Sequence, residues 1–364
     1  MNTIKNIEVI EVWMHGEKVG RIAMTPQHLS VFEYDPHFLA SGFSISPYHL
    51  PLRSGVFMAK RTPFNGGFGV FDDSLPDGWG RLILDRYLKE KGIDSFKISI
   101  LQRLALIGSR GRGALEYLPD LSSAAEEEIL DFDKIAADTY RVLTSDDPLS
   151  SVKTLYQYGG SSGGVRPKIF ITIDGREWMI KFKATMDRED IGITEYQHSV
   201  LAKECGIRMA KTKLFQDKYF GVERFDRLNG QKIHTISAAG LLNANYREPS
   251  LDYSDLLKVT LNLTKNMEEV YDLFRIMLFN VAIRNRDDHA KNFSFQLIDG
   301  QWRLSPAYDL LPSEGFNGFH TTTINNTGDP TTKDIMAIAE QLSLDKQRVD
   351  QMMGIISSKT AHNW

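Results

Sequence analysis

The chain has 364 residues, of which 42% are hydrophobic and 25% are charged, and its formal net charge is −4. This size and composition suit two or three folded units, and the acidic balance argues against nucleic-acid binding through bulk charge. The single cysteine excludes an intrachain disulfide framework, which is typical of a reducing cytoplasm. Residues 1–16 lack a secretory signal pattern and no run of about 18 apolar residues occurs, so a cytoplasmic protein is expected.

Two helix starts are indicated in the first 143 residues. The segment 75–81, Leu-Pro-Asp-Gly-Trp-Gly-Arg, is typical of a turn that opens a helix, with Trp79 in a small core. Residues 126–143 begin with three glutamates, and acidic side chains in a first turn favour a helix because they complement its dipole. The sequence indicates no chemistry of its own for residues 77–81.

A glycine- and serine-rich segment, called the Gly/Ser loop (residues 158–168), is the first candidate binding element. It contains Gly159, Gly160, Ser161, Ser162, Gly163 and Gly164. Such a loop exposes backbone amides that can hold phosphate oxygens, although most stretches of this composition are flexible linkers. It is not a Walker A loop, because no Gly-Lys-Ser/Thr follows.

Residues 168–182 predict a β-hairpin that turns at Asp174-Gly175. This register places Lys168 directly opposite Lys181 and collects the large apolar residues on the other face. Like charges in that position destabilise a hairpin, and an anion between them, such as a nucleotide triphosphate, would remove the conflict. The alternative is a different register, with two solvated lysines on an exposed face.

A helix is expected from Thr194 to Cys205, with Thr194 as its cap and Gly206 as its stop. Glu195 in its first turn can pair with Lys181, as the corresponding lysine and helix glutamate pair in protein kinases. The alternative is a glutamate that is favoured there by the helix dipole alone.

A second short hairpin is expected within residues 214–222, and it leads into the charged segment 223–227. We interpret this segment as a connector between two lobes, whose backbone groups can hydrogen-bond an adenine edge. The alternative is an ordinary charged strand end.

The most informative segment is the candidate catalytic loop, residues 286–292, with sequence Arg-Asp-Asp-His-Ala-Lys-Asn. Apolar residues at helical spacing over 270–281 predict a buried helix that leads into it. Protein kinases take the base for the attacking hydroxyl and the oxygen ligands of magnesium from an Asp-x-x-x-x-Asn loop and a later Asp. Asp287, Asn292 and Asp309 match that spacing, although the flanking kinase residues are absent.

Residues 293–304 predict a hairpin that turns at Asp299-Gly300. This register places Asn292 opposite Ala307, so that Asp309 lies beside Asn292 at the open end of the hairpin. Two oxygen ligands then converge, as a hard magnesium ion requires.

Two alternatives exist for these residues. They can be ordinary surface carboxylates, because a single Asp-x-x-x-x-Asn string occurs often by chance. They can also form a metal-dependent hydrolase site from Asp287, Asp288 and His289, although no second histidine lies at ligand spacing.

Together these motifs resemble the HipA family of toxin kinases, the kinase half of bacterial HipBA-type toxin–antitoxin modules. The resemblance covers nearly the whole chain and rests on motifs in the family's order, at 16–20, 44–46, 75–81, 113–116, 180–181, 195–196, 222–227, 287–294 and 308–309. The chain departs from the best-known pattern in carrying Asp288 where glycine is frequent.

The resemblance implies an α+β, two-lobed protein-kinase-like fold of the HipA type with an extra N-terminal mixed β/α subdomain. The subdomain would occupy residues 1–119, the kinase N-lobe with the Gly/Ser loop 120–224, and the helical C-lobe with the catalytic loop 225–364. A helix at 126–143 would bridge the subdomain to the kinase.

Residue roles follow from the same resemblance. Asp287 would be the catalytic base, and Asn292 and Asp309 the ligands of Mg²⁺. ATP would be bound by Ser161, Ser162, Gly163, Gly164, Lys168 and Lys181 at the phosphates and by Glu223 and Phe225 at the adenine connector. Family members can phosphorylate a serine of the Gly/Ser loop, which expels the loop from the nucleotide site and switches the kinase off. Ser161 and Ser162 both fill that place.

The function implied is a toxin-type serine/threonine protein kinase that transfers the ATP γ-phosphate to a protein hydroxyl, with a translation-related target. The implied partners are that protein substrate and a HipB-like helix-turn-helix antitoxin, with DNA bound mainly through the antitoxin and no membrane contact. The alternatives are a small-molecule or lipid kinase and a non-catalytic ATP-binding regulator of a DNA-binding antitoxin.

Overall fold

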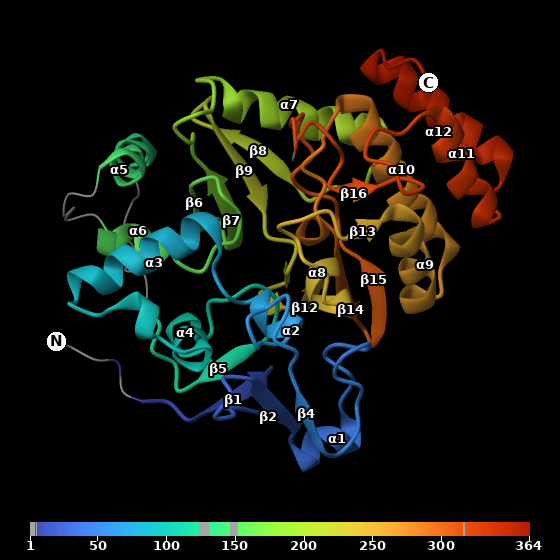
Figure 1. Ribbon diagram of the computed structural model, residues 1–364. Coiled ribbons are helices and arrows are strands. Elements are labelled where there is room, and N and C mark those ends of the chain that lie inside the picture. The colour runs from blue at the N-terminus through green and yellow to red at the C-terminus, as the bar shows by residue number, and fades with distance from the viewer. Residues whose placement is uncertain (1–3, 5, 124–130, 146–151, 316) are drawn as a thin grey trace. The chain divides into compact units, whose positions relative to one another are not determined.

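The computed structural model describes residues 4, 6–123, 131–145, 152–315 and 317–364 (Figure 1). The chain forms two compact units. Unit 1 comprises residues up to 193 together with 213–234, and unit 2 comprises residues 194–212 and 235–364. The division into three parts expected from the sequence stays a prediction.

Unit 1 begins with an antiparallel sheet in the order β4-β3-β2-β1-β5. Its strands are β1 (Val9–Met14), β2 (Glu17–Met24), β3 (Ser30–Tyr34), β4 (Val56–Met58) and β5 (Glu116–Leu118). Side chains alternate between the two faces of a strand, and the inward set, including Ile10, Val12 and Ile22, is at most 1% exposed. The helices of this region are α1 (Pro36–Ser41), α2 (Gly69–Asp72), α3 (Gly78–Glu90), η1 (Ser95–Lys97) and α4 (Ile100–Ile107).

The second sheet of unit 1 has the order β6-β7-β9-β8. Its strands are β6 (Lys168–Ile173), β7 (Arg176–Lys181), β8 (Thr212–Phe215) and β9 (Tyr219–Glu223). The predicted register is confirmed, because Lys168 pairs with Lys181. Asp174 and Gly175 have φ of +50° and +71°, as a tight two-residue hairpin turn requires. The second predicted hairpin is confirmed as β8 and β9.

One apolar core joins the second sheet to helices that precede it in the chain. Ile169, Trp178 and Ile180 from the sheet pack in the same cluster as Trp79 of α3. The helices α5 (Phe132–Thr144) and α6 (Val152–Gly159) complete it, and α3 packs directly on α6 (Figure 1). The helix expected at 126–143 is therefore observed from Phe132 onward, and its three glutamates lie outside the described residues.

Unit 2 is mainly helical. Its helices are α7 (Ile191–Glu204), which starts in the last residues of unit 1, then α8 (Ala238–Leu242), α9 (Tyr253–Thr264), α10 (Met267–Ile283), η2 (Ala290–Asn292), α11 (Thr332–Gln341) and α12 (Lys346–Thr360). The expected cap of α7 is wrong: the helix begins at Ile191, so Thr194 lies inside its first turn. Gly206, with φ of +79°, lies just beyond its end as expected. None of the helices described is long and apolar enough to span a membrane.

Three small sheets complete the fold. β12 (His234–Ser237), β14 (Ser294–Ile298) and β15 (Gln301–Leu304) form one sheet in the order β12-β14-β15. β13 (Leu251–Asp252) pairs in parallel with β16 (Thr322–Thr323). In unit 1, β10 (Arg227–Leu228) pairs with β11 (Gln231–Lys232).

The helix α10 carries the catalytic loop. The Asn266 side chain caps it by accepting the N–H of Glu268, and two glutamates in the first turn complement the helix dipole. Most of its side chains are buried, among them Leu273, Phe274 and Met277 at 0% exposure. The helix ends where Arg284 adopts a left-handed conformation with φ of +57°. The predicted buried helix is therefore confirmed, and the loop begins from a rigid element.

Candidate active site

The catalytic loop separates two neighbouring carboxylates. Asp287 is exposed, whereas Asp288 has no exposed surface at all. The loop therefore exposes one carboxylate to solvent and encloses the other in protein. The sequence alone does not distinguish them.

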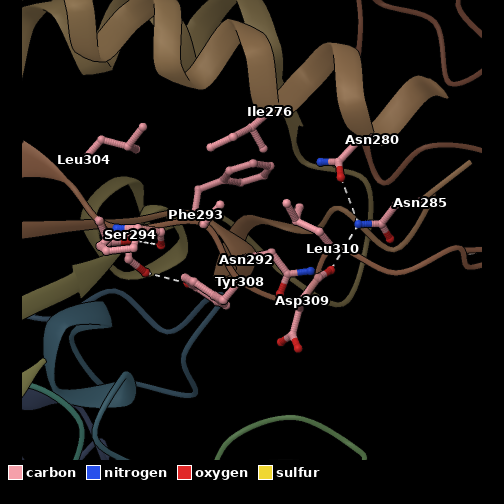
Figure 2. Close-up of a pocket in the computed structure, with 13 residues that line it drawn as sticks. Ile276, Asn280, Asn285, Asn292, Phe293, Ser294, Leu304, Tyr308, Asp309 and Leu310 are labelled. Atoms are coloured by element: carbon pink, nitrogen blue, oxygen red, sulfur yellow. Dashed lines mark hydrogen bonds between the residues drawn. The ribbon is translucent and has the colours of Figure 1, made fainter. Parts of the chain in front are cut away.

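Asn292 and Asp309 line one pocket, as expected for two ligands of a cation (Figure 2). The Nδ2 atom of Asn292 donates to the Asp287 carbonyl oxygen at 2.7 Å, which leaves the amide oxygen as the atom available to a ligand. Asp309 has φ of +54°, a left-handed conformation that aspartate tolerates better than most residues.

The hairpin beside this pocket has the predicted register over its ladder, from Phe295 paired with Leu304 to the turn at Asp299-Gly300. Its extension to Asn292 and Ala307 was wrong. Ala307 instead donates its N–H to the Arg208 carbonyl oxygen at 2.8 Å and bridges to Met209. Asn292 and Asp309 line the same pocket although the strand pairing does not extend to Asn292.

Partly buried polar contacts hold the backbone around Asn292 and Asp309 (Figure 2). The Tyr308 hydroxyl donates to the Lys291 carbonyl oxygen at 2.6 Å and contacts the Ser294 hydroxyl at 2.6 Å. Asn285 Nδ2 donates to the Asp309 carbonyl oxygen at 3.1 Å. Both the candidate catalytic loop and Asp309 are thus tied to their surroundings through main-chain atoms.

The donor set suits a magnesium ion that is shared with a ligand. No cluster of three or more His, Cys, Asp or Glu side chains suited to a metal occurs in the part of the chain that the structure describes. An Asn–Asp pair with phosphate and water oxygens is how kinases hold Mg²⁺. The hydrolase alternative loses support, because the Asp288 carboxylate is buried and faces protein donors.

In unit 1, the Gly/Ser loop is folded onto the segment 77–81. The Asp77 carboxylate accepts the N–H of Gly164, and the Trp79 N–H donates to the Gly164 carbonyl oxygen at 2.9 Å. The Trp79 indole N–H also donates to the Lys168 carbonyl oxygen at 3.1 Å. Trp79 is 1% exposed in a core and starts a helix, as expected, but this loop contact was not foreseen.

Two glycines make this close approach possible. A Cβ on Gly78 would lie 2.4 Å from the Gly164 carbonyl oxygen, and a Cβ on Gly80 would lie 2.2 Å from the Ser162 carbonyl oxygen. Both distances are shorter than any van der Waals contact. The sequence Gly-Trp-Gly at a helix start was the one feature of the sequence that could have predicted a close backbone neighbour, because glycine has no Cβ.

The two loop serines differ in their environment. Ser162 is 1% exposed, and its hydroxyl donates to the Gly159 carbonyl oxygen at 2.6 Å. Ser161 is partly exposed. Only Ser161 of the two therefore presents surface to solvent in this conformation.

Lys168 and Lys181 are each 6% exposed and lie opposite each other in the hairpin. Lys168 Nζ donates to the Gly163 carbonyl oxygen at 2.6 Å, and Lys181 Nζ lies 5.6 Å from the ring centre of Phe220. The paired, buried lysines that the register predicted are confirmed, and the alternative of two solvated lysines is wrong. Glu195 belongs to unit 2, and its pairing with Lys181 stays a prediction.

The predicted adenine connector, residues 223–227, is dominated by a buried ion cluster. Asp226 accepts hydrogen bonds from Arg224, Arg227 and the N–H of Gly113. Burial acts to raise the pKa of Asp226, but Arg224 and Arg227 outweigh it and hold that pKa well below its usual range. The segment therefore fastens the second sheet to residues 111–113.

The two residues assigned to adenine have neighbours of their own. The Glu223 carboxylate accepts from Arg176 at 3.1 Å, and the Phe225 ring centre lies 5.8 Å from the Arg112 guanidinium. Their contact with adenine stays a prediction.

Family models match both parts of the chain. The model described as HipA-like C-terminal domain matches residues 160–364, and the one described as HipA N-terminal domain matches residues 10–118. The chain is 25% identical over 340 residues to "Putative kinase Y4mE" of Sinorhizobium fredii, covering 85% of this chain and 78% of that protein. It is 22% identical over 208 residues to "Serine/threonine-protein kinase toxin HipA" of Shewanella oneidensis, covering 47% of this chain and 48% of that protein.

A solved structure shares the fold. HipA from the Shewanella oneidensis complex of HipA, HipB and operator DNA superimposes with a TM-score of 0.71 at 19% identity, covering 96% of this chain and 88% of that one. The α+β, kinase-like fold of the HipA type is thereby established for this chain. With its N-terminal and C-terminal parts each matched by a family model, the chain belongs to the HipA family.

Proposed function

We propose that the chain is a toxin-type serine/threonine protein kinase that transfers the γ-phosphate of ATP to a protein hydroxyl. One observation carries the proposal: an exposed Asp287 is followed by Asn292 and Asp309, which line one pocket of unit 2. That set matches the base and the two metal ligands of kinase chemistry. Two related proteins described above are named as kinases, which supports the proposal.

Asp287 is proposed to act on the attacking group. Its exposed carboxylate accepts the hydrogen bond of a substrate hydroxyl, orients the oxygen for in-line attack and takes up the proton. The Asp287 main-chain carbonyl is held by Asn292 at 2.7 Å, so the base and the metal ligand keep a fixed relation. Mg²⁺, when bound by Asn292 and Asp309, supplies neutralisation of the phosphate charge.

The lysine pair and the Gly/Ser loop of unit 1 are proposed to hold the ATP phosphates. Lys168 and Lys181 place two buried ammonium groups opposite each other in the sheet, and phosphate oxygens have the negative charge and the acceptor atoms to bind both. Lys168 now donates to the Gly163 carbonyl oxygen, and the Gly164 N–H is bonded to Asp77. Phosphate binding by these groups therefore requires both internal contacts to be exchanged for phosphate oxygens. Glu223 and Phe225 are proposed to flank the adenine.

Self-phosphorylation is proposed to occur on the Gly/Ser loop, with Ser161 ahead of Ser162. Ser161 has exposed surface, whereas the Ser162 hydroxyl is buried and bonded to Gly159. A phosphate on Ser162 would not fit the buried site of its hydroxyl, and on either serine the added negative charge is proposed to release the loop from segment 77–81.

The proposed partners follow the Shewanella complex. A HipB-like antitoxin would bind this chain and carry most of the DNA contact, which agrees with the net charge of −4. The substrate is proposed to be a protein of the translation machinery.

The test is phosphate transfer by the parent and by two variants. After phosphatase treatment, each protein is incubated with ATP and Mg²⁺ and examined by intact mass and phosphopeptide mapping. We expect the parent to gain phosphate on Ser161 and Asp287→Asn to lose at least about 100-fold in rate. Asp299→Asn makes the same chemical change at an exposed turn and should match the parent.

Two results would overturn the proposal. One is transfer by Asp287→Asn at the parent's rate. The other is a phosphatase-treated parent that transfers nothing to itself or to the proteins of a translation extract. In the second case the non-catalytic regulator would replace the kinase.

A further inference from the structure

Asp288 occupies an unusual position for a carboxylate. It has no exposed surface, and it accepts four hydrogen bonds from donors within unit 2. The donors are the Tyr253 hydroxyl at 3.0 Å, His320 Nδ1 at 2.8 Å, the Thr321 N–H at 2.9 Å and the Thr322 N–H at 3.2 Å. A buried carboxylate needs such compensation, and here it is complete on both oxygens. Because a carboxylate only accepts, His320 carries its proton on Nδ1.

The contacts continue from Asp288 toward the metal ligand. The Tyr253 hydroxyl accepts from Asn280 Nδ2 at 3.0 Å, and Asn280 Oδ1 accepts from Asn285 Nδ2 at 3.0 Å. Asn285 Nδ2 also donates to the Asp309 carbonyl oxygen at 3.1 Å. Tyr253, Asn280 and Asn285 are at most 2% exposed.

The chain of contacts has a fixed direction. Burial and the nearby Asp288 carboxylate raise the pKa of Tyr253, so its hydroxyl stays protonated and donates to Asp288 while it accepts from Asn280. Figure 2 shows the step from Asn280 through Asn285 to Asp309 at the rim of the pocket. The network thus starts at Asp288, the residue that follows Asp287, and ends on the main chain of Asp309.

We propose that Asp288 is a positioning residue for the phosphotransfer: through Tyr253, Asn280 and Asn285 it fixes the catalytic loop relative to Asp309. This inference rests on the proposed kinase function. Asp288 touches no substrate and acts only by holding Asp287 and the two metal ligands in one geometry. Groups that orient metal ligands from behind commonly change metal affinity or activity by about 10- to 100-fold when removed.

The most informative variant is Tyr253→Phe. It deletes the one hydroxyl that links Asp288 to Asn280 and leaves the carboxylate with its three other donors. Tyr117→Phe is the matched control, because Tyr117 is 0% exposed in unit 1 and its hydroxyl likewise donates to one partner, Ser74 Oγ, at 2.7 Å. Asp288→Asn is the stronger change, since an amide placed against four donors leaves some of them unpaired.

The experiment measures two quantities on parent, Tyr253→Phe, Tyr117→Phe and Asp288→Asn. One is the rate of phosphate transfer as a function of Mg²⁺ concentration. The other is Mn²⁺ affinity in the presence of a non-hydrolysable ATP analogue, which requires no catalysis. We expect Tyr253→Phe to lower kcat and weaken Mn²⁺ binding by about tenfold each, and to raise the Mg²⁺ requirement. Tyr117→Phe should lose a similar amount of thermal stability, but its kcat, its Mg²⁺ requirement and its Mn²⁺ affinity should equal those of the parent.

The outcomes separate this inference from the kinase proposal. If the parent transfers no phosphate, the kinase proposal fails, and the Mn²⁺ affinities still decide the positioning role. Equal kcat, Mg²⁺ requirement and Mn²⁺ affinity in Tyr253→Phe and Tyr117→Phe would overturn it. So would a parent that binds no Mn²⁺. If Asp288→Asn does not fold, the tyrosine pair alone gives the answer.

Discussion

The catalytic loop of unit 2 and the Gly/Ser loop of unit 1 are each fastened by a carboxylate that accepts backbone N–H groups. Asp288 is completely buried and accepts from Thr321 and Thr322 at 2.9 and 3.2 Å. Asp77 is partly exposed to solvent and accepts the N–H of Gly164. The same kind of contact, a carboxylate that accepts backbone N–H groups, therefore occurs once in the protein interior and once near the surface.

The environments set how easily each contact opens. A buried carboxylate that loses its donors is left without water to replace them, which costs several kcal/mol. A partly exposed carboxylate exchanges its donor for water at a net cost of about 1 kcal/mol. The catalytic loop is accordingly built to keep one geometry, whereas the Gly/Ser loop can be released.

Acid should destabilise unit 1 more than the surroundings of Asp288 in unit 2. Burial lowers the pKa of His234, in unit 1, to about 4 from the unfolded value of 6.5. Between those two pH values the unfolded chain binds a proton that the folded chain does not. Stability is therefore complete above pH 6.5 and falls as the pH drops toward 4, by about 2 kcal/mol at pH 5 and about 3 kcal/mol at pH 4.

Unfolding in urea at pH 7 and pH 5 measures this loss. His234→Gln should lose the part of the pH dependence that comes from His234. Its side-chain amide can still donate to the Ile45 carbonyl oxygen, which His234 contacts at 2.9 Å. The exposed His37→Gln should retain it. Hydrogen exchange should show unit 1 opening in acid before the amides around Asp288. Equal pH dependence in parent and His234→Gln would contradict the prediction.

The two loops also differ in how much of them the sequence predicts. Both hairpin registers follow from local alternation and an Asp-Gly turn, so Lys168 opposite Lys181 and Phe295 opposite Leu304 could be foreseen. The spacing of Asp287 and Asn292 likewise lies within one short segment. Local patterns suffice where the neighbours of a residue are close in sequence.

The remaining features depend on distant neighbours. Asp77 and Gly164 are 87 positions apart, and no periodicity connects them. Asp287 and Asp288 are identical as residues, and only the packing of residues 253 and 320–322 buries one of them. The extension of the second hairpin failed for the same reason, because Ala307 found its partner at Met209, far upstream.

Crowding the Gly/Ser loop should release it. In Gly80→Ala the new Cβ would lie 2.2 Å from the Ser162 carbonyl oxygen, so loop or helix must move, at a cost of about 1–3 kcal/mol. We expect a lower free energy of unfolding and faster proteolysis within residues 160–167. Gly354→Ala, in α12 with no atom within 4 Å of its new Cβ, should gain about 0.5–1 kcal/mol. A loop that resists protease in Gly80→Ala as in the parent would contradict the close packing.

Removing the carboxylate should release the same loop more gently. Asp77→Ala removes the hydrogen bond that the Gly164 N–H donates to a partly exposed carboxylate, and the loss of such a bond lowers stability by about 1 kcal/mol. We expect the variant to bind ATP about threefold more tightly. In the parent, Asp77 occupies the Gly164 N–H in part of the population, and that part cannot use this N–H to bind phosphate; the substitution removes this competing state. Asp94→Ala is the matched control, since Asp94 is exposed and accepts the Phe96 N–H at 3.0 Å, within unit 1 but in a separate turn. Weaker ATP binding in Asp77→Ala would mean that Asp77 shapes the loop for the nucleotide, and both loops would then be held in place for catalysis.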